Sequence, residues 1–298
     1  MMTTANSPLR VRTALSHALR GTMQWRLWLL WIAITGLCAL IGALPAWNWL
    51  GGVLDNSLLG VAVGKGNAPE LIVEAISAKG APLGVLSGGI RFATLLMLLL
   101  APLLAGATVA AARSRETTLR FGDLLRGGIG EYGPMLRMLI WSVIPLGIAV
   151  LAAVTIMGVN ETAHDQAVLA SELDVGRRIA WIIGGVLWVV AHASLEAGRG
   201  WLAADGRLRS AVKAWWRGLK LLLRRPMAVL SVYLVTTVAG LLLAVLMVGV
   251  RQHIDANTGL GFVLAMLAGF GITAALACSR IARLFGMQSL AQDMHARR

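Results

Sequence analysis

Charged residues are scarce in this sequence, and acidic residues are the scarcer of the two signs. Only 14% of the 298 residues are charged, and Asp and Glu together number 14. A soluble globular domain carries about 25% charged residues, so this composition excludes an ordinary soluble protein. What the chain has instead is 57% hydrophobic residues and a mean hydropathy of +0.74.

Cysteine and histidine are also rare, which excludes several kinds of site. The two cysteines, Cys38 and Cys278, both fall inside apolar runs and form neither a disulfide framework nor a metal-ligand pattern. The five histidines are scattered, and no nucleophile with a neighbouring base can be assembled from the sequence. We therefore expect no metal, no cofactor and no enzymatic activity.

The hydrophobic residues gather in six runs of about 20 residues, the length that crosses the roughly 30 Å hydrocarbon core of a bilayer. None of the runs contains Lys or Arg, and Glu196 and His192 are the only acidic residue and the only histidine inside them. We expect an all-α polytopic membrane protein that forms a single membrane domain over residues 1–298. The six predicted transmembrane helices are Leu27–Ala46, Phe92–Ala112, Met138–Met157, Ile179–Gly198, Met227–Val250 and Gly259–Ser279.

The basic residues lie mostly on one side of these spans. With the N-terminus in the cytoplasm, the cytoplasmic segments, counted together with Glu196 at the end of the fourth span, hold 21 Lys and Arg against 6 Asp and Glu, and the outer segments hold 6 against 8. The positive-inside rule then places both the N-terminus and the C-terminus in the cytoplasm. Arg outnumbers Lys 23 to 4, and Ala and Gly are abundant, which favours a bacterium with GC-rich DNA. We expect the bacterial cytoplasmic (inner) membrane as the location.

The segments around the spans follow a repeated pattern. Ahead of each odd-numbered span, apolar residues at i, i+3 and i+4 are followed by Arg-Gly, in "LSHALRG" (15–21), "FGDLLRG" (121–127) and "VKAWWRG" (212–218). The even-numbered spans end in small residues and Arg, in "AGATVAAAR" (105–113), "AHASLEAGR" (191–199) and "ITAALACSR" (272–280). The sequence therefore predicts three repeated helical hairpins, each introduced by an amphipathic interfacial helix. The hairpins cover approximately 8–113, 116–199 and 207–283.

The first outer loop, residues 47–91, is long enough to carry a helix of its own. In "NAPELIVEAISAKG" (67–80), Asn67 and Glu70 make a capping box, and Gly80 provides a helix stop. We expect this helix to lie on the outer face of the membrane or to cap the bundle.

The net charge of +13 calls for an anionic partner, which in a soluble protein would suggest nucleic acid. Here the basic residues flank membrane spans, where anionic lipid headgroups attract them by about 1 kcal/mol each. We therefore expect no nucleic acid partner. The alternative to lipid contact is that these basic residues are solvated and only determine the orientation of the spans by the positive-inside rule. The expected contacts with anionic headgroups on the cytoplasmic face are Arg10, Arg12, Arg20, Lys213, Arg217, Lys220, Arg224 and Arg225.

One polar pair interrupts the apolar runs. His192 and Glu196 are four residues apart and share a helix face, and Arg199 follows one turn later. An ionisable residue at membrane depth favours a functional site, whereas the equivalent residues of the first hairpin, Gly106 and Ala110, are a packing pair. Two interpretations stay open. The pair is either structural and satisfied by Arg199 or water, or it forms a ligand or proton site with Arg199.

Two stretches of the sequence resemble a known group of proteins. They are the small-residue helix end followed by Arg in "AGATVAAARSRETTLRFGDLLRG" and the basic run leading to "RRPMAVL". With these features the chain resembles a group of bacterial six-helix membrane proteins that includes the membrane domain found beside some glycerophosphoryl diester phosphodiesterases. The 298 residues contain no catalytic phosphodiesterase domain, so the resemblance implies a six-helix fold and an accessory role in the membrane.

Two functions follow from these observations as expectations. The first is a non-enzymatic scaffold or a partner- or lipid-binding module in the inner membrane, whose protein partner the sequence does not identify. The alternative is a small carrier or lipid-handling protein with a polar site near His192 and Glu196. A carrier should have a cavity that is lined by polar groups and reaches the membrane midplane, whereas a scaffold should have a dry core.

Overall fold

The computed structural model describes residues 9, 11–54, 60–64, 69–77, 81–114, 119–163, 170–255 and 258–297. All regular secondary structure in these ranges is α-helix. The helices are α1 (Val11–Thr22), α2 (Trp25–Leu54), α3 (Gly60–Gly64), α4 (Pro69–Ser77), α5 (Leu83–Arg113), α6 (Phe121–Ala163), α7 (Ala170–Ala204), α8 (Ala211–Arg224), α9 (Pro226–Gln252) and α10 (Gly259–Ala296).

Six helices of the described chain are long and apolar enough to cross a membrane: α2, α5, α6, α7, α9 and α10. Their outer surfaces carry large apolar side chains that no described part of the protein covers, as at Ile148 (62% exposed), Leu242 (65%) and Leu267 (57%). Continuous apolar surface of this kind is unfavourable in water and stable against lipid. The chain is therefore a multi-pass membrane protein in contact with a bilayer.

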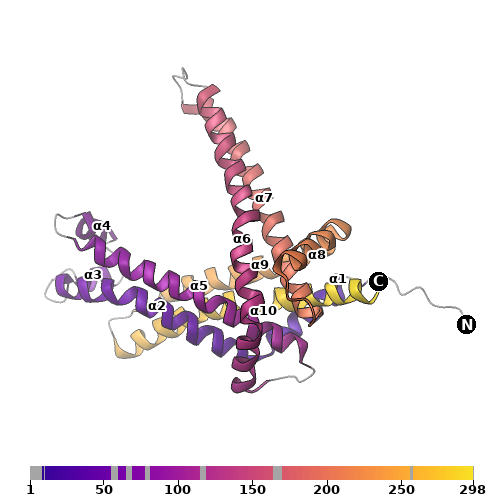
Figure 1. Cartoon of the computed structure of the whole chain (residues 1–298). Coiled ribbons are helices and arrows are strands. Elements are labelled where there is room, and N and C mark those ends of the chain that lie inside the picture. The colour runs from indigo at the N-terminus through magenta and orange to yellow at the C-terminus, as the bar shows by residue number, and fades with distance from the viewer. Residues whose placement is uncertain are drawn as a thin grey trace, which may run out of the picture.

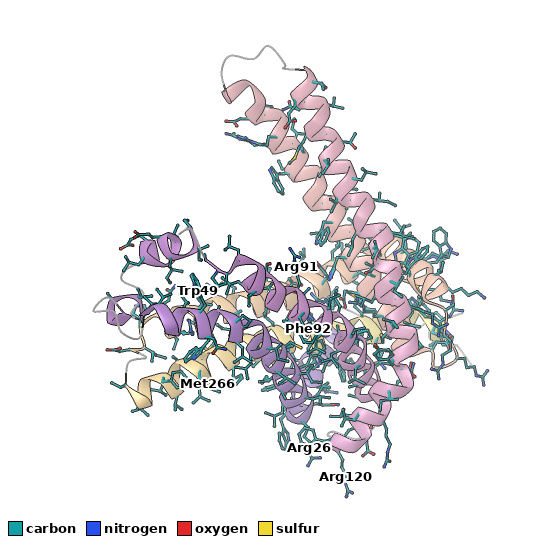
Figure 2. The ribbon with its side chains drawn as sticks, turned by 60° about the vertical axis from the view of Figure 1, so that its left-hand side comes forward. Arg26, Trp49, Arg91, Phe92, Arg120 and Met266 are labelled. Carbon is teal, nitrogen blue, oxygen red and sulfur yellow. The ribbon has the colours of Figure 1, made fainter. Side chains whose placement is uncertain are left out.

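The six long helices form three pairs that extend from one end of the molecule, where α6 also packs closely on α5 and α10 on α7. α2 packs on α5, α6 on α7 and α9 on α10. Figures 1 and 2 show the α6–α7 pair leaning away from the other two pairs, so the three pairs share contacts mainly where they converge. The convergent end carries α1, α8 and the C-terminal part of α10, and we call it the basal end.

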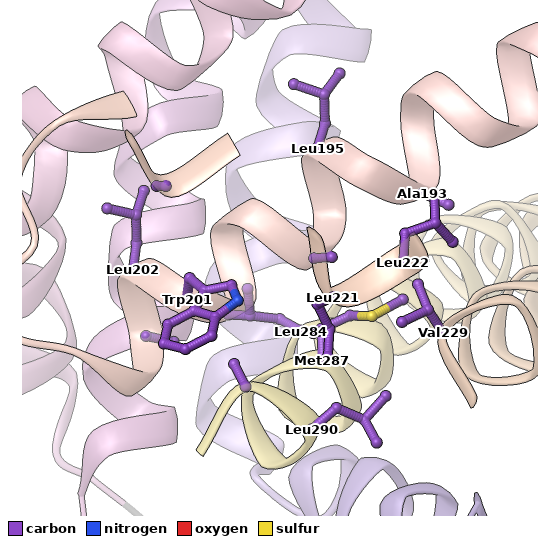
Figure 3. Close-up of a cluster of buried hydrophobic side chains, with 14 of the residues drawn as sticks. Ala193, Leu195, Trp201, Leu202, Leu221, Leu222, Val229, Leu284, Met287 and Leu290 are labelled. Atoms are coloured by element: carbon purple, nitrogen blue, oxygen red, sulfur yellow. The ribbon is translucent and has the colours of Figure 1, made fainter. Parts of the chain in front are cut away.

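The most deeply buried apolar side chains gather at the basal end, where α7, α8, α9 and α10 meet (Figure 3). Trp201 and Leu202 from α7, Leu221 from α8, Val229 from α9 and Met287 from α10 are all 0% exposed. The cluster also includes Ala14 from α1, Val109 from α5 and Met135 from α6, and its members lie up to 280 positions apart in the sequence. It therefore fastens the second and third helix pairs to each other.

The three Arg-Gly motifs place their glycines where two helices touch. A Cβ atom added at Gly21, Gly127 or Gly218 would lie only 2.3–2.4 Å from an atom of α10, α5 or α7, respectively. These are the helices on which α1, the start of α6 and α8 pack. At Gly218 the nearest atoms are backbone atoms of α7, so any side chain would push the two helices apart. At Gly21 and Gly127 the nearest atoms belong to the side chains of Phe285 and Ala110, which would have to shift.

The helix boundaries differ from the predicted ones at the basal end. The sequence predicts a separate interfacial helix over 121–127, but α6 runs from Phe121 to Ala163 without a break and holds Pro134 inside it. The sixth predicted span ends at Ser279, but α10 continues to Ala296 and buries Arg283. Both helices continue because their basal parts pack against protein, so the appearance of charged residues does not end them.

The first outer loop contains more helix than the single helix predicted for residues 67–80. α2 extends into it as far as Leu54, and α4 lies within the helix predicted for 67–80. The proposed cap and stop, Asn67 and Gly80, lie outside the described residues.

Candidate functional site

A cavity of about 450 Å³ opens where the six long helices converge. This size falls within the usual range of ligand sites, about 300–1,000 Å³. Each of the six helices contributes to its lining, so the site depends on all three helix pairs. The lining residues are Trp31, Met97, Leu98, Ala101, Pro102, Ala105, Thr108, Met135, Leu139, His192, Glu196, Arg199, Tyr233, Thr237, Arg280, Arg283 and Leu284.

One wall of the cavity is charged and is built by α7 and α10. His192, Glu196 and Arg199 follow one another at one-turn steps on α7, and Arg280 and Arg283 do so on α10. Three guanidinium groups therefore face a single carboxylate. With a neutral histidine, this wall has an excess of two positive charges.

Glu196 is the centre of the ion pairs in this wall. Its Oε1 lies 2.5 Å from Nη1 of Arg199 and 3.9 Å from Nε2 of His192, and its Oε2 lies 3.6 Å from Nε of Arg283. The Glu196 side chain is only 7% exposed, and a carboxylate buried to that extent needs such partners. Arg283 is also held by a hydrogen bond from its Nη1 to Oγ1 of Thr237, at 2.7 Å.

Arg280 differs from the other two arginines because, within the described chain, no carboxylate lies within ion-pair distance of it. Its guanidinium carbon lies 5.4 Å from the centre of the Trp31 ring, which is a cation–π contact. The ring is held in place because Nε1 of Trp31 donates a hydrogen bond to Oγ1 of Thr108, at 3.2 Å. Arg280 is therefore fixed in position and still available to an anion.

The part of the cavity lining that α5 contributes, which we call the apolar wall, is apolar from Met97 to Ala105. At 1.5 Å per residue, the lined part of α5 between Met97 and Thr108 is roughly 17 Å long. Leu98 is 46% exposed, so this wall continues onto the outer surface of the helix bundle. Pro102 lies in the same wall and cannot donate the helical hydrogen bond to the carbonyl of Leu98.

Sequence reasoning identifies the α7 half of the charged wall and misses the α10 half. Arg280 and Arg283 come directly after the sixth apolar run, so the sequence places them in a cytoplasmic flank. The available signal was the repeat itself, because Arg280 and Arg199 hold the same ninth position in the even-numbered span ends. The structure brings both arginines to one cavity.

The third arginine of that pattern, Arg113, takes part in a different cluster outside the cavity. Its Nη1 lies 2.6 Å from Oε1 of Glu131, whose side chain is 10% exposed, and the same carboxylate oxygen lies 3.9 Å from Nη1 of Arg209. Arg113 also donates hydrogen bonds to the carbonyls of Leu202 and Ala203. This cluster ties the ends of α5 and α7 to α6.

The basic residues predicted to contact headgroups divide into two sets. Arg217 and Arg225 form ion pairs inside the protein, with Nη1–Oδ2 distances of 2.9 Å to Asp205 and 2.7 Å to Asp293. Arg10 lies outside the described residues. The residues that are exposed at the basal end, and so remain open to headgroups, are Arg12, Arg20, Lys213, Lys220 and Arg224.

The Asp205–Arg217 pair is electrostatically stabilised. Burial raises the pKa of the Asp205 carboxyl, but hydrogen bonds from Arg217 and from the backbone N–H of Arg207 outweigh this effect. The pKa of Asp205 therefore lies below its usual value, and the pair stays charged at neutral pH.

Across the described residues, no group of three or more His, Cys, Asp or Glu side chains could hold a metal ion. No family model, no curated protein and no solved structure matches the chain. These comparisons leave the resemblance drawn from the sequence without added support.

Proposed function

We propose that this protein is a non-enzymatic membrane module that binds an acidic amphiphile, a lipid with an anionic headgroup, in the cavity among its six long helices. The observation that carries the proposal is the pairing of a wall with excess positive charge, on α7 and α10, with an apolar wall on α5. Uncompensated charge at membrane depth is costly, and an anionic headgroup would neutralise it. An apolar tail would cover the α5 wall at the same time.

The depth of the two walls supports one orientation for this ligand. Arg199 lies five residues from the basal end of α7, and Thr108 lies five residues from the basal end of α5. The apolar wall continues past this level to Met97, away from the basal end. The headgroup would therefore point toward the basal end, and the tail would point toward the middle of the membrane, as in a lipid of the adjacent leaflet.

We also propose that the basal end faces the cytoplasm of a bacterial inner membrane. The distribution of Lys and Arg supports this orientation, because 21 of the 27 fall in the basal segments. In this orientation α1 and α8 are the interfacial helices, and their exposed basic residues contact anionic headgroups. The ligand of the cavity would then come from the cytoplasmic leaflet.

The proposed repeat of three hairpins is supported by the way the Arg-Gly glycines pack. The start of α6 packs on α5 and α8 packs on α7, so each introducing helix contacts the even-numbered span of the preceding pair. α1, which introduces the first pair, packs on α10 of the last pair. The three units thus follow one another around a closed ring, with the cavity where they meet.

A small lipid carrier is the second candidate, and one observation favours it. The charged wall lies among the membrane helices, and the apolar wall reaches the outer surface at Leu98, so a lipid could enter and leave sideways. Reconstitution in vesicles separates the two candidates. A carrier would move a fluorescent acidic lipid between leaflets, whereas a binding module would retain it without transfer.

The binding proposal is tested by native mass spectrometry of the full chain purified in a neutral detergent. We expect one acidic lipid per chain to be retained by the wild type and lost in Arg280→Gln. The matched control is Arg137→Gln, which removes the same charge from an exposed position of α6 that does not line this cavity. Equal retention by both variants, or a wild type that retains only zwitterionic lipid, would overturn the proposal.

A further inference from the structure

We infer that the cavity is built for a lipid phosphomonoester, whose headgroup carries up to two negative charges, in preference to a phosphodiester lipid, which carries one. This inference rests on the proposed function and names its ligand class. The charge of the lining is the first observation, because Arg199, Arg280 and Arg283 oppose only Glu196. A terminal phosphate, with a second pKa near 6, carries close to the two charges that would balance this wall.

The hydrogen-bond donors that remain in the wall are the second observation. Arg199 and Arg283 each use one terminal nitrogen, on Glu196 and Thr237, and Arg280 makes no hydrogen bond within the described chain. The buried Nε of Arg283 makes no hydrogen bond there either, but it lies 3.6 Å from Oε2 of Glu196 and is not counted among the free donors. A terminal phosphate presents three acceptor oxygens, whereas a phosphodiester presents two non-ester oxygens. The number and spread of the free donors therefore suit the monoester.

The apolar lining on the basal side of the cavity is the third observation. Met135 and Leu284 line the cavity there, are 3% and 5% exposed, and belong to the buried apolar cluster. Figure 3 shows Leu284 beside Met287 in that cluster. A phosphodiester headgroup would have to place a further alcohol beyond its phosphate, against these buried apolar side chains. A monoester ends at the phosphate and needs no such space.

The test uses two lipids with identical acyl chains, phosphatidic acid as the monoester and phosphatidylglycerol as the diester. They compete for the full wild-type chain in neutral detergent, and bound lipid is measured by native mass spectrometry. We expect the dissociation constant for phosphatidic acid to be lower by about tenfold, the effect of 1.4 kcal/mol, which is the order of one additional charge-assisted hydrogen bond.

Arg280→Gln should bring that ratio close to one, and Arg137→Gln should leave it unchanged. The wild-type competition alone decides the question if either variant fails to fold. Equal affinity for the two acidic lipids would refute the monoester preference while leaving the proposed function in place. Binding of both no tighter than that of phosphatidylcholine would refute the proposed function itself, and with it this inference.

Discussion

Replacing Glu196 by glutamine should lower the stability of the protein and increase the stabilisation that an acidic lipid provides. The substitution keeps the size of the side chain and removes the single negative charge that Arg199 and Arg283 share, at 2.5 Å and 3.6 Å. Removing one partner of a buried ion pair costs about 3–5 kcal/mol. We expect the lower end, about 3 kcal/mol, because the Arg199 side chain is 24% exposed and retains some solvation.

The same substitution should increase the effect of an acidic ligand. It frees Arg199 and raises the excess charge of the wall from two to three, so phosphatidic acid should stabilise Glu196→Gln by at least about 1 kcal/mol more than it stabilises the wild type. Thermal and urea unfolding, followed by tryptophan fluorescence in neutral-detergent micelles with and without the lipid, measures both quantities.

Glu131→Gln is the matched control for this experiment. Glu131 is a second buried carboxylate, 10% exposed and 2.6 Å from Arg113, but it lies outside the cavity. Its replacement should also destabilise the protein, yet the gain from phosphatidic acid should equal that of the wild type. The reasoning is wrong if Glu196→Gln loses less than about 1 kcal/mol, or if the lipid stabilises the two variants equally.

Three further predictions concern the frame that holds the cavity. Gly218→Ala should lower the free energy of unfolding by about 1–3 kcal/mol, because the new Cβ would lie 2.4–2.8 Å from backbone atoms of α7. Gly122→Ala is the control and should not lower it, because a Cβ there would have no neighbouring atom within 4 Å. Unfolding midpoints measure both variants, and equal midpoints would contradict the packing of α8 on α7. Arg113→Gln should lower the free energy of unfolding by about 3–5 kcal/mol, because it leaves the buried Glu131 carboxylate without its partner at 2.6 Å. Lipid retention per folded chain should stay unchanged, and reduced retention would show that this cluster acts on the cavity. Spin labels at Val53 and Val159, near the far ends of α2 and α6, should come closer together in a bilayer disc than in micelles. The reason is that transmembrane helices tilt only about 0–40° from the bilayer normal, whereas the α6–α7 pair leans away from the other helices; an unchanged distance would contradict this expectation.

The sequence predicts the membrane class correctly because hydrophobic run length is a direct physical requirement of a bilayer. All six predicted spans fall within long helices of the structure. Helix ends at the basal side were predicted less well. The rule that charge marks the end of a span fails at Ser279, because α10 continues into a protein-packed region where Arg283 pairs with Glu196.

The candidate site could be predicted only in part, because half of it is not local in sequence. His192, Glu196 and Arg199 stand out as one face of one helix. Arg280 and Arg283 are 84 and 87 positions from Glu196 and line the same cavity only because α10 packs on α7. No sequence pattern within α10 alone predicts that α10 packs on α7. The excess positive charge, on which the proposed function depends, becomes visible only once both helices are placed.

The most direct test of the account is photocrosslinking with a phosphatidic acid that carries a photoreactive group in its acyl chain. In membranes containing the full chain, we expect the adducts to concentrate on α5 between Met97 and Ala101 and on Leu139 of α6. A surplus of unlabelled phosphatidic acid should abolish them, and phosphatidylcholine should not. Adducts spread over outward-facing residues such as Leu242 and Leu267, with equal competition by both lipids, would contradict a lipid site among the six helices.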